Sequence, residues 1–333
     1  MKTLARIFSV ILAFVLTLSA SASVMTGEPD SEKSKSYSKS YPVGSGDKIT
    51  LDNSFGEMKI STWSKNEIKV DVSITAKAST DEYAQKIIDM ISIEDGKNGS
   101  EIFFKTRLKG NERSRDDKED RKEKNTSFKI NYTVYLPANA TLDATNQFGS
   151  LVIGDFDGAA NLTAKFGSLT AGKLSQPKRV RVEFGSATVE SMNGGKIDVR
   201  FSSAQFNKLS GEITADFEQS HNAKINLDNN LKKIDIKVNF SDLLLDADKN
   251  FSASYKIKNS LGSFSNKSDF SIPKQEDDNH RYFNKNEVYN GKSGSGSTPV
   301  DIKNNFGHIT IGHNLPFDIN DKAKNKHEKK IKV

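Results

Sequence analysis

Two aspartates, Asp155 and Asp157, flank Phe156 just before Gly158 and form the first pair of carboxylates whose spacing suits acid–base chemistry. Hydrolysis of a glycosidic bond needs two carboxylates on either side of that bond, roughly 5 to 9 Å apart. Aspartate close to glycine is also a common turn signal. Acidic residues do not recur at one position of neighbouring repeats, as a catalytic cluster on a repeat surface would require. We therefore predict that both aspartates are turn residues and that the chain has no catalytic residue.

Metal-binding patterns are equally incomplete. The segment Asp246-Ala-Asp248-Lys-Asn250 begins like a calcium loop, but the sixth position holds Phe251 instead of glycine and the twelfth holds Ile257 instead of glutamate. The histidines are dispersed, and His308 falls at a corner position that serine occupies in other repeats, near His313. The chain has no cysteine, so it has no thiolate ligand. We expect no metal and no cofactor.

Aromatic and amide side chains are the remaining candidates. Trp63 could be a sugar platform or a core residue that covers an edge, and the second interpretation is favoured. The polar segment Pro273–Thr298 carries Tyr282, Phe283 and Tyr289, which we predict as the contact surface. Four asparagines precede a Phe-Gly or Leu-Gly pair by two residues, and alternation points them inward: Asn53, Asn146, Asn259 and Asn304. A buried amide is costly unless it is bonded, so we predict structural bonds from these four to corner backbone groups.

The elements that position these residues are repeats. Four segments align directly, each with alternating apolar residues and then a Phe-Gly-Ser or Phe-Ser-Ser corner: Leu142–Leu151, Leu162–Leu169, Val180–Ala187 and Ile197–Ala204. Alternation predicts strands with one buried face, and such units bury that face only by stacking on one another. The predicted fold is mainly β, a parallel β-solenoid, right-handed by the crossover rule. Stacking then predicts an internal ladder of buried rings from Phe148, Phe166, Phe184, Phe201, Phe217 and Phe240.

The first residues indicate export. Lys2 and Arg6 form a basic start, Ile7–Leu18 is apolar, and Ala20-Ser21-Ala22 is a small-residue cleavage site, as in a secretory signal peptide. The formal net charge is +6 and the pI about 9.1. Both signs are mixed along the chain, and an exported protein is a poor candidate for a nucleic-acid partner. We expect a glycan or an envelope protein as partner, and no transmembrane segment after removal of the signal.

These patterns divide the chain. We predict a signal peptide (1–22), a polar linker (23–46), a small α+β N-terminal cap (47–140) with a charged loop (109–124), solenoid repeats (141–272), a polar loop (273–298), a last rung (299–315) and a basic tail (316–333). The cap is expected to hold a strand at 67–78 and one helix at 81–90.

The repeated Phe-Gly-Ser-Leu corner, the entry Ser127–Pro137 and the early run Asn53–Trp63 together resemble a family of exported bacterial β-strand-repeat proteins of unknown function, often labelled adhesins by inference. The resemblance implies a β-solenoid in the periplasm or at the cell surface of a Gram-negative bacterium. It implies no established chemistry. We therefore expect a non-enzymatic, adhesin-like scaffold or binding module of the cell envelope. The alternatives are a carbohydrate-active enzyme on a β-helix and a periplasmic partner of a membrane regulator.

Overall fold

The structure of the protein is a computed structural model that describes residues 31–109, 126–276 and 286–319. In this part of the chain the fold is mainly β, with one sheet of 21 strands and the single helix α1 (Asp81–Met90). The predicted fold class is confirmed at that level. The strands are β1 (Ser31–Pro42), β2 (Lys48–Ser54), β3 (Met58–Trp63), β4 (Glu67–Ala78), β5 (Ile91–Asn98), β6 (Glu101–Leu108), β7 (Ser127–Pro137), β8 (Thr141–Gln147), β9 (Leu151–Ile153), β10 (Phe156–Lys165), β11 (Ser168–Glu183), β12 (Ser186–Arg200), β13 (Ser203–Glu218), β14 (Ala223–Leu227), β15 (Leu231–Asn239), β16 (Asp242–Ala247), β17 (Ala253–Ser260), β18 (Ser263–Lys267), β19 (Asn286–Ser293), β20 (Thr298–Asn305) and β21 (His308–Gly312).

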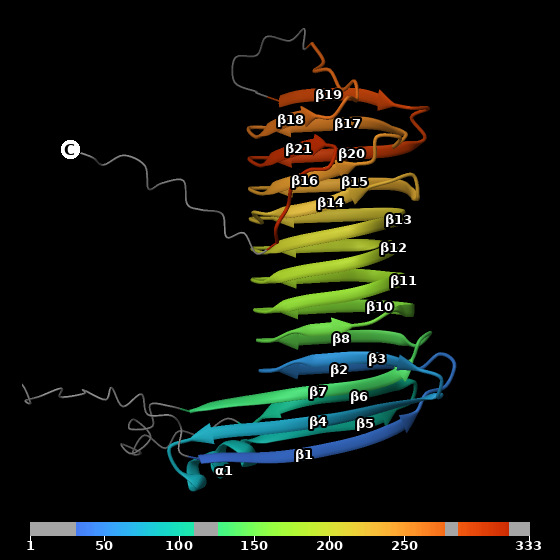
Figure 1. Ribbon diagram of the computed structural model, residues 1–333. Helices are drawn as coiled ribbons and strands as arrows, with labels where there is room; N and C mark the ends of the chain where they lie inside the picture. The colour runs from blue at the N-terminus through green and yellow to red at the C-terminus, as the bar shows by residue number, and fades with distance from the viewer. Residues whose placement is uncertain (1–30, 110–125, 277–285, 320–333) are drawn as a thin grey trace, which may run out of the picture.

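From β2 and β3 to β17 and β18, the strands stack in two parallel ladders (Figure 1). One ladder runs β2–β8–β10–β11–β12–β13–β15–β20–β17, and it contains the strand ends that lead into the corners. The other runs β3–β9–β11–β12–β13–β14–β16–β21–β18 and contains the strand starts that follow the corners. Corner residues of successive rungs therefore lie above one another.

The core fills the space between the ladders. Leu162, Val180 and Ile197 are register partners and all buried, as are Leu169 and Ala187 on the other ladder. Apolar side chains alternate with polar ones along strands such as β10 and β11, so one face of these strands is buried and the other faces solvent. Burial of apolar surface is the main stabilising term in such a stack.

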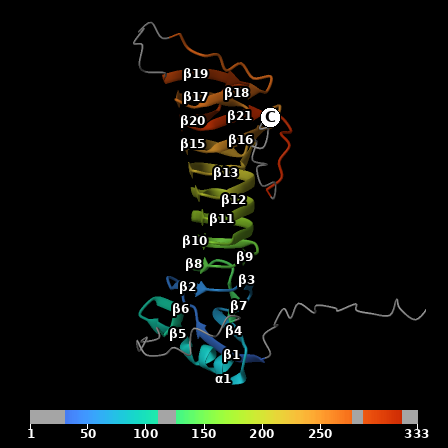
Figure 2. The same cartoon turned by 90° about the vertical axis from the view of Figure 1, so that its left-hand side faces the viewer.

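The N-terminal end contains the antiparallel pairs β1–β4, β4–β7 and β5–β6, and a further antiparallel pair, β17–β19, lies at the C-terminal end of the stack. Strand β4 pairs with β1 on one side and β7 on the other, and helix α1 lies at this end of the stack (Figure 2). Thr80 caps the helix, because its hydroxyl accepts a hydrogen bond from the Tyr83 backbone N–H at 3.3 Å. The strand and the helix predicted at 67–78 and 81–90 are confirmed.

The polar linker predicted at residues 23–46 is wrong where the chain is described, because residues 31–42 form β1. Tyr37 and Tyr41 lie on one face of this strand and pack against the core, while serine and lysine side chains face solvent. A segment as polar as 31–42 is typical of a linker. It can nevertheless form an edge strand, because such a strand has to pack only one of its two faces against the core. Exposed lysines on such a strand also discourage pairing with other chains.

The stack starts earlier than predicted. Strands β2 and β3 lie inside the predicted cap, yet they pair in parallel with β8 and β9 as a full rung. Phe55 turns the corner of this rung, and its ring stacks on that of Phe148 with centroids 5.0 Å apart. The sequence copy at Asn53–Gly56 is therefore the first rung of the stack.

The C-terminal rungs do not follow chain order. Strand β20 pairs with β15 on one side and β17 on the other, and β21 lies between β16 and β18 in the same way. The rung predicted as the last, 299–315, is thus the last in the sequence, but in the structure it lies between two earlier rungs. The predicted polar loop 273–298 is also partly wrong, because β19 forms within it and pairs antiparallel with β17.

Some predicted features lie outside the described residues: the signal peptide 1–22, nearly all of the charged loop 109–124, Tyr282 and Phe283, and most of the basic tail. The part of the chain that the structure describes contains no helix long and apolar enough to cross a membrane.

Candidate functional site

The corner between the two ladders has one conformation throughout the stack. Its residue has a positive φ, between 47° and 66°, although it is never glycine; in spatial order the corner residues are Phe55, Phe148, Phe166, Phe184, Phe201, Gln219, Phe240, Phe306 and Leu261. The left-handed region costs a residue with a side chain roughly 1–2 kcal/mol. We call this row of residues the phenylalanine edge.

The internal ladder predicted from the sequence is wrong in its direction. The rings of Phe148, Phe166, Phe184 and Phe201 are 45–50% exposed, and Phe240 is 52% exposed. Alternation holds up to Ala164, which is buried, and Lys165, which points outward. The left-handed bend at the next residue then breaks the alternation and turns the phenylalanine outward as well.

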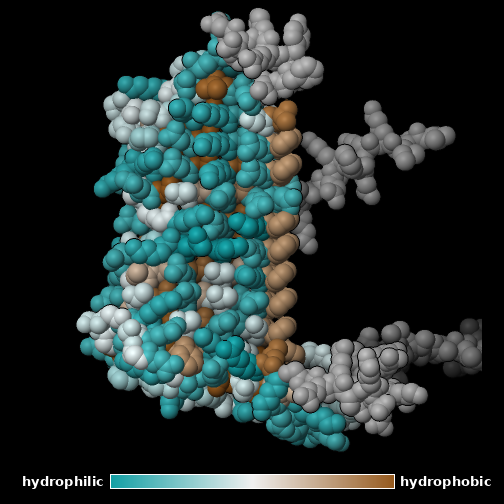
Figure 3. All heavy atoms as spheres, turned by 180° about the vertical axis from the view of Figure 1, so that it is seen from behind, coloured by the Kyte–Doolittle hydropathy of each residue, from teal (hydrophilic) through white to brown (hydrophobic). Residues whose placement is uncertain are grey.

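The stacking part of that prediction is confirmed for the rings that share the edge. Successive centroids lie 4.8 Å apart for Phe148–Phe166, 5.1 Å for Phe166–Phe184 and 4.6 Å for Phe184–Phe201, with interplanar angles of 4–8°. The same geometry continues between Phe240 and Phe306 at 4.8 Å and 1°. Figure 3 shows the edge as an apolar column on the outside of the molecule, interrupted once by hydrophilic atoms.

Phe217 does not belong to the edge. It is fully buried, and its register partners are Val199 and Val238 of the inner column. The corner of this rung is Gln219, two residues later, with φ 47°. An alignment of the repeats by residue type places Phe217 at the corner. The true corner is Gln219, and it could have been recognised from Ser220, which follows it as a serine or glycine follows the other corner residues.

The residue after the corner must be small. A Cβ on Gly167 would lie 2.0 Å from the carbonyl oxygen of Gly149 in the rung below. In the middle of the stack serine replaces this glycine, and the hydroxyls bond from rung to rung. The Ser220 backbone N–H donates to the Ser241 hydroxyl at 2.9 Å, and the Ser220 hydroxyl donates to the Val199 carbonyl at 3.1 Å. The corners are therefore closely packed and fixed.

The four asparagines all lie inside, in two pairs on neighbouring rungs. Asn53 donates to the side-chain oxygen of Asn146 at 3.0 Å, and Asn304 donates to that of Asn259 at 2.7 Å. Asn146 also donates to the carbonyls of Gly56 and Ser150, and Asn304 to the carbonyl of Gly307 at 2.9 Å. These amides bind the backbone of the corners that carry exposed rings.

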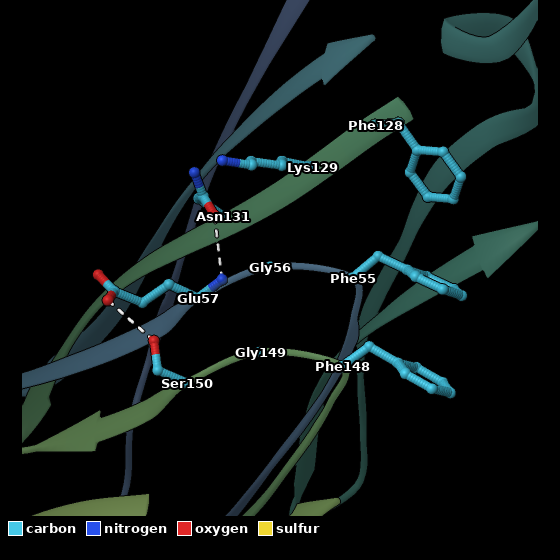
Figure 4. A pocket seen from close by; sticks show the side chains of 9 residues that line it. All are labelled: Phe55, Gly56, Glu57, Phe128, Lys129, Asn131, Phe148, Gly149 and Ser150. Carbon is cyan, nitrogen blue, oxygen red and sulfur yellow. Dashed lines mark hydrogen bonds between the residues drawn. The ribbon is translucent and has the colours of Figure 1, made fainter. Parts of the chain in front are cut away.

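A hollow of about 520 Å³ lies at the N-terminal end of the edge (Figure 4). The rings of Phe55, Phe128 and Phe148 line one side, with Phe128 tilted against Phe55 at 5.0 Å. Polar groups line the other side, where the Ser150 hydroxyl donates to the Glu57 carboxylate at 3.0 Å. The hollow thus joins an apolar wall to a polar one.

The charged flank of the edge is neutralised in the N-terminal rungs. Glu183 lies next to Phe184, between Arg181 and Lys165. Partial burial opposes its ionisation, but the hydrogen bonds and charges of Arg181 and Lys165 hold the pKa of this carboxyl below its usual range. Arg200 pairs with Glu218 at 3.5 Å in the rungs above.

The aspartates considered for catalysis and calcium binding hold the backbone and neighbouring rungs. Asp155 accepts a hydrogen bond from the Lys173 backbone N–H at 2.8 Å, and Asp157 accepts one from the Ser175 hydroxyl at 2.6 Å. Asp246 pairs with the buried ammonium of Lys224 at 2.6 Å. The residues 31–109, 126–276 and 286–319 contain no group of three or more side chains that could hold a metal ion.

His308 and His313, the two histidines that are closest in sequence, contact different groups. His308 is exposed at the corner of its rung and contacts the Ser263 hydroxyl. His313 sits between the Ala247 carbonyl, 2.6 Å from Nδ1, and the Asp269 carboxylate, 2.8 Å from Nε2. The Ala247 carbonyl raises the pKa of His313 against the opposing effect of partial burial, and Asp269 adds to the rise.

Neither aromatic candidate outside the edge is a free platform. Trp63 stacks on Tyr135 at 5.4 Å, the Lys65 ammonium lies 4.8 Å from the centre of the Trp63 ring, and its Nε1 donates to the Glu67 carbonyl. Tyr289 packs on Phe264 at 4.8 Å. Burial and the neighbouring carboxylate of Glu287 raise the pKa of Tyr289 to about 12, so it stays a neutral donor. The predicted contact surface therefore lacks Tyr289 as a free ring.

Comparisons with known proteins were made for the whole chain. No protein-family model and no curated protein matches it. Among solved structures it is similar to a candidate cell adhesion protein from Clostridium sporogenes (13% identity, TM-score 0.24, covering 84% of this chain and 100% of that chain). It is also similar to a candidate adhesin from Bacteroides fragilis (12%, 0.38, 83% and 97%) and to a candidate lipid binding protein from Parabacteroides distasonis (12%, 0.33, 83% and 96%).

Proposed function

We propose that this protein is a non-catalytic, adhesin-like binding module of a bacterial cell envelope, built as a right-handed parallel β-solenoid with an N-terminal α+β cap. The rungs form the rod, and the phenylalanine edge is the surface that meets the partner. The signal-like first residues support export to the periplasm or cell surface of a Gram-negative bacterium.

The observation that carries this proposal is the exposure of the stacked rings. A single exposed apolar side chain needs no explanation, but a contiguous apolar patch on a soluble protein marks an interaction site. Here every ring of the edge after Phe55 is about half exposed, and each sits on a left-handed residue, so the fold keeps the row at a conformational cost. Stacking of neighbouring rings offsets this cost only in part, at about 0.5–1.5 kcal/mol per pair.

The absence of catalysis is part of the proposal. It is supported by what the carboxylates do: Asp155 and Asp157 accept hydrogen bonds from the next rung, and Glu183 is held ionised by Arg181 and Lys165. General acid–base catalysis needs a group with a pKa near the working pH. These acids are instead engaged in structural bonds.

The test is sedimentation of the purified protein with isolated Gram-negative envelope fragments. We expect binding that the double substitution Phe166→Ser and Phe184→Ser reduces by at least about tenfold, while Lys173→Gln at an exposed position of β11 leaves it unchanged. In parallel, a panel of polysaccharides is incubated with the protein and assayed for new reducing ends or unsaturated products. Product release that a single Asp or Glu substitution abolishes would favour the carbohydrate-active enzyme instead.

A further inference from the structure

The last three rungs of the phenylalanine edge carry a second feature, a column of lysines. Lys237, Lys303 and Lys258 are register partners on β15, β20 and β17, and all three are exposed. Each lies three residues before the corner residue of its rung, Phe240, Phe306 or Leu261 in that order. The insertion of β20 between β15 and β17 is what brings the three cations into one column, about 4.8 Å apart along the stack.

These lysines have no opposite charge within ion-pair distance among the described residues. Like charges placed directly opposite each other on neighbouring strands are destabilising. Asp216, the register partner below Lys237, instead reaches Lys196 at 3.9 Å. In the preceding rungs, by contrast, charged residues beside the edge form pairs such as Arg200–Glu218.

The column of residues two positions before the lysines, farther from the corner, does not cancel their positive charge. It consists of Asp235, Asp301 and Lys256 on the same three strands. Asp235 is held by Lys233 at 2.9 Å. The three rungs therefore keep an excess of positive charge beside an apolar ridge.

The exposed apolar ridge consists of the ring edges of Phe240 and Phe306 and the side chain of Leu261. The ring planes of Phe240 and Phe306 are 1° from parallel with centroids 4.8 Å apart, so each ring covers a face of the next. A sugar or a base that stacks on an aromatic face finds few free faces here. A convex line of ring edges fits a soft apolar medium into which it can sink.

We propose that this part of the edge docks on the surface of an anionic lipid bilayer. Phe240, Phe306 and Leu261 enter the boundary between headgroups and acyl chains, where aromatic and apolar side chains partition. The lysine column lies alongside at the level of the anionic headgroups, to which its flexible side chains reach. The inference rests on the proposed function, because it assigns a partner to the same edge.

The test is flotation of the purified protein with vesicles of phosphatidylcholine alone and of phosphatidylcholine with about one third phosphatidylglycerol. We expect flotation with the anionic vesicles that raised salt weakens, since screening shortens the reach of surface charge. The triple substitution Lys237→Gln, Lys258→Gln and Lys303→Gln should lower the partition coefficient by about a hundredfold. Phe240→Ser with Phe306→Ser should lower it with both vesicle types.

The matched control is Lys173→Gln, Lys208→Gln and Lys249→Gln, which removes the same charge from exposed positions off the edge and should change partition by less than about threefold. Equal loss in both triple variants would overturn the lysine column as the cause. Retention on dextran sulfate without vesicle flotation would replace the bilayer by an anionic polysaccharide. If vesicles fail but envelope fragments still bind through Phe166 and Phe184, this inference falls and the proposed function stands. Unchanged thermal melting of every variant establishes that the folds are comparable.

Discussion

The ring of Phe184 lies 5.1 Å from that of Phe166, 4° from parallel, and both rings are about half exposed. Both residues have the costly left-handed backbone conformation. Their rings contact each other and solvent, and neither ring is part of the core. The stability of the protein and its surface chemistry are therefore carried by different phenylalanines.

Replacing Phe184 with alanine should lower the free energy of unfolding by only about 1 kcal/mol, because stacking is lost but no cavity opens. Phe217→Ala removes a fully buried ring from the inner column and should cost about 3–5 kcal/mol. Urea unfolding of the two variants compares them directly. Equal losses would mean that the edge rings are core residues in solution.

Gly167→Ala should be strongly destabilising, by at least about 1–3 kcal/mol, because the new Cβ would meet the Gly149 carbonyl oxygen at 2.0 Å. Gly154→Ala is the matched control, since no atom lies within 4 Å of the place that its new Cβ would take and its φ is not left-handed. Thermal melting measures both. A harmless Gly167→Ala would show that the rungs are farther apart than the structure has them.

Asn304→Leu should cost about 1–3 kcal/mol, because it leaves the Gly307 carbonyl and the Asn259 side-chain oxygen without their buried donor. Asn305→Ala is the control on the adjacent outward position, where the amide bonds to Asn239 at the surface. Chemical denaturation distinguishes the two. If both variants were equally stable, the amide pair would not secure the corner.

His313 should make stability depend on pH. Its pKa is raised in the folded chain, chiefly by the Ala247 carbonyl and also by Asp269, with partial burial and Lys249 opposing the rise. The protonated form is thus the one that the fold stabilises. The contribution is fully present below the ordinary pKa of about 6.5 and is lost as pH rises through the folded value.

Melting temperatures measured from about pH 5 to about pH 9 should therefore fall across that window in the native chain. His313→Gln should flatten this part of the profile, and Asp269→Asn should shift its midpoint toward lower pH. A profile that His313→Gln leaves unchanged would contradict the assignment.

The sequence by itself determined the mainly β class, the strand alternation, and the strand and helix at 67–78 and 81–90, because these follow from local periodicity. It also located most corners, because Phe-Gly-Ser or Phe-Ser-Ser interrupts the alternation there, but it placed the corner of one rung at Phe217 instead of Gln219. Local pattern and register together place Asn53, Asn146, Asn259 and Asn304 at inward positions. These inferences depend on neighbours in the chain.

Tertiary structure decided the rest. Alternation cannot say where a side chain points once φ becomes positive, so the outward turn of Phe166 and the inward position of Phe217 required the backbone itself. Strand β1 forms from a polar segment because β4 offers it an edge. Strand β20 enters between β15 and β17 because pairing partners are chosen in space. The lysine column and the stacking of Phe240 on Phe306 both result from that choice, since the fold unites residues that lie far apart in the chain.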